Sequence, residues 1–142
     1  MYFFKEGFCW TNILNPQARL LKVKLKRVSV NDVGSMSLFS MLDSVPNYYI
    51  ITLLNSDLLF DYYREFINCT VNIQINDIRQ MPIIIPTKEH LLICNNLVQN
   101  AFSIKKKIFN NSILRPDIDM ELTVVDQKLR NFVDKLYNIV CS

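Results

Sequence analysis

The stretch LLKVKLKRVSV, from Leu20 to Val30, contains the clearest strand signal in the sequence. Apolar residues alternate with lysines there, and a period of two is typical of a half-buried strand with one apolar face and one solvated face. Such a strand needs a sheet and a core to cover its apolar face. The apolar face would hold Leu21, Val23 and Leu25, and the opposite face Lys22, Lys24 and Lys26.

Three further segments predict short strands. Residues 1–14 mix aromatic and polar groups and predict a strand that is broken at Gly7 and turns Trp10 toward the core. Residues 71–76 alternate valine and isoleucine with asparagine and glutamine, which predicts a second half-buried strand. Residues 81–86 form an apolar run with a proline near each end, which indicates a strand at the edge of a sheet.

Three segments predict helices. Residues 48–67 carry apolar side chains at spacings of three and four and predict an amphipathic helix, with Asn55-Ser56 at or near a turn. Thr87 is a suitable N-cap for a helix over residues 88–109, and residues 121–140 predict a final amphipathic helix. We therefore expect an α+β fold, in which a small twisted β-sheet packs on an amphipathic helix and two long C-terminal helices follow.

Length and composition restrict the possible functions. The 142 residues suit one compact unit, with an α+β region over 1–87 and a helical spacer or docking region over 88–142. Two glycines are too few for a glycine-rich phosphate-binding loop, and the net charge of +3 permits a nucleic-acid partner without requiring one. The sequence has no long apolar run and no signal-peptide pattern, so we expect a cytoplasmic protein without a membrane partner.

The sequence offers little catalytic chemistry. The four cysteines are far apart and His90 is the sole histidine, so we predict neither a metal site nor a nucleophile–base pair. Pro116-Asp117 with Asp126 and Lys128 matches the residue order of metal-dependent nucleases. Those enzymes carry the pattern on paired strands, whereas here it falls in a predicted helix. We therefore expect no enzymatic activity and no cofactor.

Two groups of polar residues could bind nucleic acid. The lysines of the first strand could each contact a DNA phosphate, although an ordinary solvated strand face would look the same. Asn72, Gln74 and Asn76 would share one side of the strand at 71–76, and such amides can pair bidentately with adenine. Outward-facing polar residues of a half-buried strand explain them equally well, so spacing alone leaves both interpretations open.

The order of the segments resembles the target-recognition region of bacterial restriction–modification enzymes. The resemblance covers about residues 3–137 and includes the C-terminal parts of type IIG enzymes and N6-adenine DNA methyltransferases, as well as type I specificity subunits. Its motifs are a Leu-Asn-Ser helix, an Ile-Pro segment, the helix that follows and a closing helix. They correspond here to Leu53–Ser56, Gln74–Ile83, the segment from Lys88 onward and Asp126–Tyr137.

The resemblance implies a non-catalytic domain or fragment that binds double-stranded DNA sequence-specifically, because the family's methyltransferase domain would lie upstream. It implies that basic side chains contact the DNA backbone and that polar loop residues read base edges in the major groove. The backbone contacts would be Lys22, Lys24, Lys26 and Arg27, and the base-reading residues Asn12, Asn68, Thr70, Asn72 and Gln74.

The resemblance also implies partners for the C-terminal helices. They would dock a methyltransferase or restriction subunit, or pair with a second copy as a homodimer. The alternative is a degenerate protein-interaction module that docks or self-associates through these helices and does not bind DNA.

Overall fold

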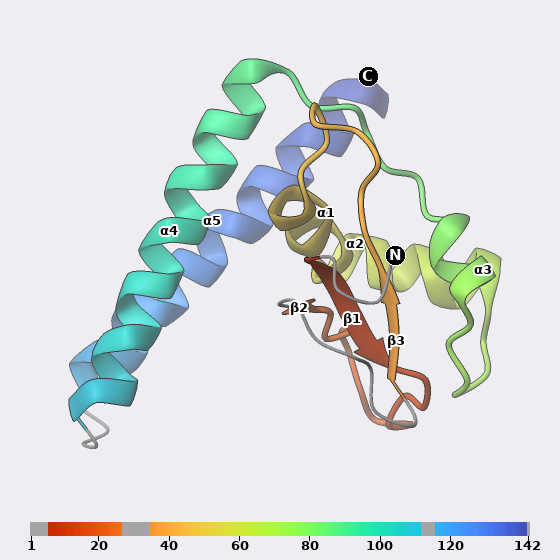
Figure 1. The fold of residues 1–142 in the computed structure, drawn as a ribbon, viewed down its shortest axis with the longest axis horizontal. Coiled ribbons are helices and arrows are strands. Elements are labelled where there is room, and N and C mark those ends of the chain that lie inside the picture. Colours follow the sequence, from red (N-terminus) through yellow and green to blue (C-terminus); the bar gives the residue numbers. More distant parts are fainter. Residues whose placement is uncertain (1–5, 27–34, 112–115, 142) are drawn as a thin grey trace. The chain divides into compact units, whose positions relative to one another are not determined.

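The computed structural model describes residues 6–26, 35–111 and 116–141. Within them a small antiparallel sheet comes first, a group of short helices follows, and two long helices come last (Figure 1). The predicted α+β class with two long C-terminal helices is confirmed. The chain divides into two compact units, Met1–Ile85 and Pro86–Ser142, which are described separately below.

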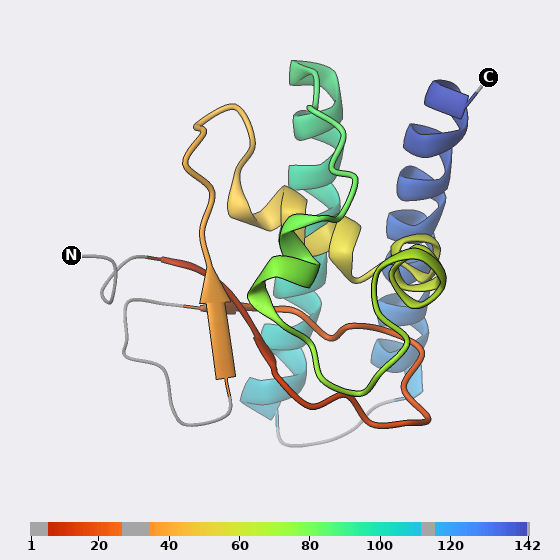
Figure 2. The same ribbon diagram turned by 90° about the vertical axis from the view of Figure 1, so that its right-hand side faces the viewer.

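The sheet of the first unit has β1 (Gly7–Thr11) in the middle, between β2 (Lys24–Lys26) and β3 (Ser35–Leu38). Both pairings are antiparallel (Figure 2). Trp10, on β1, is 2% exposed, which confirms that it faces the core. The prediction that Gly7 breaks the strand is wrong, since Gly7 is the first residue of β1. A Cβ atom at this position would overlap the carbonyl oxygen of Leu38, which explains the glycine.

The strand predicted over Leu20–Val30 is much shorter in the described residues. Within this segment only the residues of β2 pair with β1, and Lys22 adopts a left-handed backbone conformation with φ of 54°. Leu21 and Val23 are buried as predicted, but they lie in an irregular segment before β2. The predictions that Leu25 faces the core and that the strand is continuous are wrong, since Leu25 is 37% exposed; residues 27–30 lie outside the described part.

The amphipathic helix predicted over 48–67 is confirmed, with an interruption at Asn55-Ser56. It consists of α1 (Asn47–Leu54), α2 (Asp57–Tyr62) and a π-helical turn, η2 (Tyr63–Ile67). The Ser56 side chain both ends α1 and begins α2: its hydroxyl donates to the Leu53 carbonyl at 2.6 Å and accepts from the Leu59 N–H at 3.3 Å. This use of one hydroxyl explains why the chain bends there.

The prediction of a strand over residues 71–76 is wrong. The segment makes one isolated bridge, between Asn72 and Ile13, and then turns into the short helix α3 (Ile75–Arg79). The Asp77 carboxylate accepts a hydrogen bond from the Gln74 N–H at 2.9 Å, which caps the helix start. This local capping competes with extension of the bridge into a strand.

The prediction of an edge strand over residues 81–86 is also wrong. The segment has no strand pairing and continues as an irregular connection toward the second unit. Prolines at 82 and 86 remove two of its backbone N–H donors. Its anchors are the buried Met81 side chain and the Ile84 carbonyl, which accepts from the Tyr49 hydroxyl at 2.8 Å.

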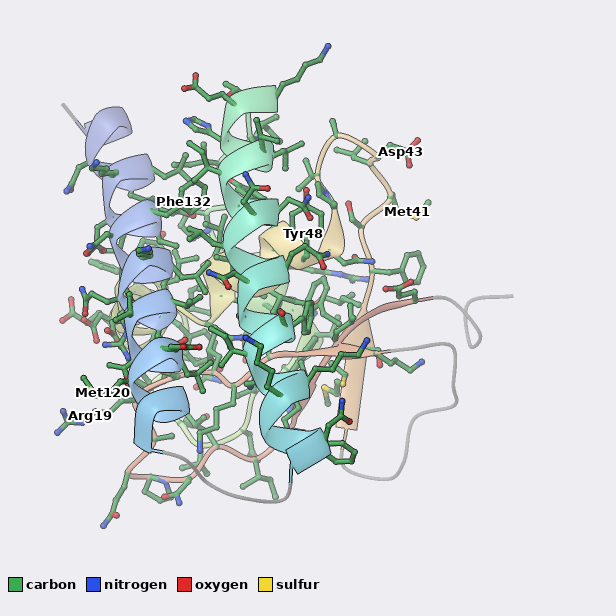
Figure 3. The ribbon with its side chains drawn as sticks, turned by 90° about the vertical axis from the view of Figure 1, so that its left-hand side faces the viewer. Arg19, Met41, Asp43, Tyr48, Met120 and Phe132 are labelled. Atoms are coloured by element: carbon green, nitrogen blue, oxygen red, sulfur yellow. The ribbon has the colours of Figure 1, made fainter. Side chains whose placement is uncertain are left out.

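The second unit is an antiparallel pair of helices, α4 (Lys88–Asn111) and α5 (Pro116–Cys141) (Figures 1 and 3). The predicted cap is confirmed, since the Thr87 hydroxyl accepts from the His90 N–H at 3.2 Å. The ring of His90 meets that of Phe132 edge-on, with centroids 6.4 Å apart. The predicted helices are confirmed, but α4 ends later than predicted, at Asn111, and α5 begins earlier, at Pro116.

Apolar residues at alternating spacings of four and three form the contact seam typical of paired helices. The apolar spacing over residues 88–109 also predicts Leu92 on the buried side of α4, and this prediction is wrong because Leu92 is 61% exposed. No helix among the described residues is long and apolar enough to cross a membrane. The seam positions are Cys94, Leu97, Ala101 and Ile104 on α4 and Val125, Leu129, Phe132 and Leu136 on α5.

Candidate nucleic-acid interface

The polar residues predicted to read bases lie close together at the end of β1. Two backbone hydrogen bonds join the chain after β1 to the loop before α3: the Leu14 N–H donates to the Val71 carbonyl at 2.6 Å, and the Ile73 N–H donates to the Asn12 carbonyl at 2.8 Å. Two loops that are distant in sequence thus form one surface. We call its five polar residues the amide cluster: Asn12, Asn68, Thr70, Asn72 and Gln74.

Asn68 is the centre of the amide cluster, and its side chain is fully used inside the protein. Its Nδ2 donates to the Asn72 carbonyl and to the Asp77 carboxylate, both at 2.8 Å. Its Oδ1 accepts from the Thr70 N–H at 2.8 Å and from the Thr70 hydroxyl at 2.6 Å. Asn68 therefore holds the loop in shape, and it could read a base only if these bonds broke.

The remaining members of the amide cluster differ in their exposure. Asn72 and Gln74 are exposed, whereas Asn12 is half-buried. Gln74 is the N-cap of α3: the Asp77 carboxylate accepts from its backbone N–H, and the Gln74 side chain accepts from the Asp77 N–H in a capping box. Asn72 is therefore the amide best placed to reach an external partner, and Gln74 is exposed but also caps the helix.

Arg64 supports the same loop and was not among the residues singled out in the sequence. Its Nη1 donates to the Cys69 carbonyl at 3.0 Å and to the Thr70 carbonyl at 2.9 Å, while its guanidinium lies 5.8 Å from the centre of the Phe60 ring. These contacts tie the loop to η2. A single arginine in a helical segment carries no sequence signal for this role, because the carbonyls that it binds are set by the tertiary structure.

Tyr63 lies beneath the amide cluster. Its side chain is fully buried, and burial, reinforced by the nearby Asp77 carboxylate, raises the pKa of its hydroxyl to about 12 despite the opposing charge of Arg64. The hydroxyl is close to Asp77 and Asn68 but makes no hydrogen bond of standard geometry. It remains neutral near pH 7 and serves as a packing group.

The predicted row of lysines is only partly available to a partner. Lys22 and Lys24 are exposed, but Lys26 is 9% exposed. Lys26 lies opposite Gly7 in the register of β2 and β1. The prediction that Lys26 would be solvated like its neighbours is wrong, and Arg27 lies outside the described residues.

The exposed lysines and the amide cluster are connected through β1. Lys24 pairs with Cys9 on that strand, and Asn12 follows Cys9 by three residues, or about 10 Å at the rise of an extended chain. The lysines and the amide cluster are therefore close along β1, although side-chain alternation turns Cys9 and Asn12 toward opposite faces of an extended chain. Cationic side chains can bind a polyanion, and amides can offer hydrogen-bonding groups to it.

The described residues include no group of three or more histidine, cysteine or acidic side chains that could hold a metal ion. The nuclease-like residues Asp126 and Lys128 lie on α5 and are exposed, so the predicted helical setting of this pair is confirmed. No protein-family model matches the sequence, and no curated protein matches it significantly. A function for this chain must therefore be inferred from the chemistry and geometry of its residues.

Proposed function

We propose that this chain is a non-catalytic DNA target-recognition domain, or part of one, from a bacterial restriction–modification system. The observation that carries the proposal is the convergence of the amide cluster at the end of β1, near the exposed Lys22 and Lys24, just before and at the start of β2. The resemblance to type IIG enzymes and type I specificity subunits supports the same function. A methyltransferase or restriction subunit would supply the chemistry.

The proposed residue roles follow from exposure and bonding. Lys22 and Lys24 contact DNA phosphates, which gives affinity and orientation without sequence information. Asn72 and Gln74 reach base edges in the major groove, where their amides are suited to adenine. Asn68 is a positioning residue because it holds the loop that carries both.

A preformed loop makes this assignment energetically reasonable. Ordering side chains and loops on binding costs free energy, and the cost falls when the loop already has its bound shape. Four hydrogen bonds from Asn68 and two from Arg64 hold the loop before any partner arrives. The binding free energy is then available for contacts with DNA.

Duplex binding by the full chain tests the proposal. Fluorescence anisotropy with a mixed-sequence DNA duplex at low salt should detect binding, and selection from a random duplex library should enrich a defined sequence. Reversing the charges of Lys22 and Lys24 to Glu should weaken binding and flatten its salt dependence. Lys88→Glu with Lys107→Glu, which reverses two exposed lysines of α4, is the charge-matched control. Absence of duplex affinity at low salt would overturn the proposal.

The second candidate is a protein-interaction module without DNA binding. It is favoured by large apolar side chains exposed on the second unit, among them Phe102 at 49% and Phe109 at 87%. This candidate predicts that charge reversal at Lys22 and Lys24 leaves every measured interaction unchanged. The duplex-binding experiment therefore separates the two functions.

A further inference from the structure

The outer side of α2 and η2 carries an apolar stripe beside acidic residues. Leu58, Tyr62 and Phe66 are four residues apart, and they are 39%, 38% and 70% exposed. The Tyr62 and Phe66 rings are in contact, with centroids 5.0 Å apart. Asp61 and Glu65 are exposed and each precedes an aromatic residue of the stripe. We call these five residues the acidic aromatic face.

The C-terminal half of α4 carries a stripe of similar length with the opposite charge. Phe102 and Phe109 are seven residues apart, which places their rings on one side of the helix about 10 Å apart along its axis. Lys105 and Lys106 lie between them at helical spacings of three and four and are exposed. We call these four residues the lysine–phenylalanine face.

The composition of α4 makes the charge of this face one-sided. Glu89 is the only acidic residue of α4, and it lies in the first turn, far from Lys105 and Lys106 along the helix. Side chains as large and as exposed as Phe109 and Phe66 are unfavourable in water, and an exposed apolar group with a defined charge pattern typically marks a contact surface. Each face thus needs a partner that offers apolar groups and the opposite charge.

We propose that the partner is a second copy of this chain, with the lysine–phenylalanine face of one copy covering the acidic aromatic face of the other. Pairing two lysine–phenylalanine faces would oppose lysines to lysines, and pairing two acidic aromatic faces would oppose carboxylates, each at an electrostatic cost. The crossed pairing brings opposite charges together and buries four aromatic rings. It is independent of the proposed DNA binding.

The crossed pairing also defines a symmetry. Each chain carries one face of each kind, on different compact units. A two-fold dimer in which both crossed contacts form contains the same contact twice and is closed, whereas one crossed contact per neighbour would let the assembly grow into a filament. We expect a dimer whose stability falls as salt rises, because part of the contact is electrostatic.

Sedimentation velocity of the full chain at low salt, over a wide range of concentrations, tests the proposal. The wild-type chain should dimerise, and each of two double variants, Lys105→Glu with Lys106→Glu and Asp61→Lys with Glu65→Lys, should raise the dimer Kd by about tenfold or more. A chain carrying all four changes should recover dimerisation, because the charges are again complementary.

Two further variants show whether the effects are specific to the proposed contact. Lys88→Glu with Lys107→Glu removes the same charge from α4 outside the face and should leave the dimer Kd unchanged. Phe109→Ser changes a side chain that is 87% exposed, so it should weaken the dimer without unfolding the chain. A chain that stays monomeric at all concentrations, reversals without effect, or a four-fold variant that fails to recover dimerisation would overturn the proposal. So would reversal at Lys105 and Lys106 that weakens duplex DNA binding and leaves self-association intact.

Discussion

The side-chain amide of Asn55 pairs with both backbone groups of Val23. The Val23 N–H donates to Asn55 Oδ1 at 2.7 Å, and Asn55 Nδ2 donates to the Val23 carbonyl at 2.8 Å. The amide thereby occupies the place that a neighbouring strand would take. Val23 is buried, so without this pairing its polar backbone would lose water and gain no partner. Asn55 thus ties the end of α1 to the segment that enters β2.

Replacing Asn55 should test this tie directly. Asn55→Ala removes two partners from a buried backbone and should lower the free energy of unfolding by about 2–3 kcal/mol. Asn55→Asp should also destabilise, because a carboxylate accepts from the Val23 N–H but repels the Val23 carbonyl. Urea denaturation measures both, and the exposed Asn76→Ala is the matched control. Equal stability of Asn55→Ala and Asn76→Ala would contradict the assignment.

Ionisation of the Tyr63 hydroxyl should destabilise the fold at high pH. Its pKa rises from 10.0 to about 12 on folding, so between these values the unfolded chain releases a proton that the folded chain keeps. Stability is therefore fully present below pH 10 and falls as pH rises toward 12, by about 2 kcal/mol from this group. Thermal denaturation of wild type and Tyr63→Phe over this range gives the difference.

The same variant tests the environment of the hydroxyl at neutral pH. Because the buried hydroxyl makes no hydrogen bond of standard geometry, Tyr63→Phe should be neutral or stabilising by about 1 kcal/mol at pH 7. Tyr62→Phe, at a more exposed tyrosine, is the control. A clear loss of stability on Tyr63→Phe would show that the hydroxyl does have a partner.

Substitutions in the amide cluster should distinguish residues that stabilise the fold from residues that contact DNA. Asn68→Ala removes four hydrogen bonds and should lower both the free energy of unfolding, by about 2 kcal/mol, and the affinity for duplex DNA. Asn72→Ala with Gln74→Ala should reduce discrimination between cognate and altered duplexes by about 1–3 kcal/mol, and its loss of stability should be confined to the removal of Gln74 from the α3 capping box. If the double variant keeps full sequence discrimination, base reading by these side chains is wrong.

Lys24 and Lys26 should behave differently despite their spacing. Exposed Lys24 should contact a phosphate, so Lys24→Ala should weaken duplex binding on all sequences and reduce the salt slope by about 0.9. Lys26 is 9% exposed, so Lys26→Ala should act mainly on stability through the lost packing of its stem. Anisotropy titrations at several salt concentrations, with urea denaturation of the same proteins, measure both effects. Identical behaviour of the two variants would contradict the structural distinction.

Local patterns in the sequence predicted the helices well. The apolar spacing over 88–109 and 121–140 continues for several helical turns, so it is improbable that it matches a helical period by chance. Each apolar stripe also needs another part of the protein to cover it. Asn55-Ser56 was correctly placed at a turn because these side chains compete with helical hydrogen bonding. The burial of Trp10 and the helix cap at Thr87 were predicted from similarly local sequence features.

The strands were predicted less well because a strand is defined by its neighbour. Alternation over 20–26 and over 71–76 correctly identified several buried side chains, yet only residues 24–26 pair with β1. Around Val23 an asparagine side chain replaces the neighbouring strand, and after Asn72 the Asp77 cap starts a helix. Periodicity identified some core-facing side chains but failed at Leu25 and Val71, which are each 37% exposed, and at the buried Lys26. It also does not show which backbone groups pair with a neighbouring strand.

By itself, the sequence determined the helical hairpin, the main buried positions and the residue types available for binding, because these depend on composition and short-range spacing. Only the tertiary structure decided which of those residues remain available. It brought Asn12 and Asn72 together, used Asn68 internally and buried Lys26 beside Gly7. Each of these outcomes depends on hydrogen bonds or close packing between residues distant in the chain, and no local pattern contains that information.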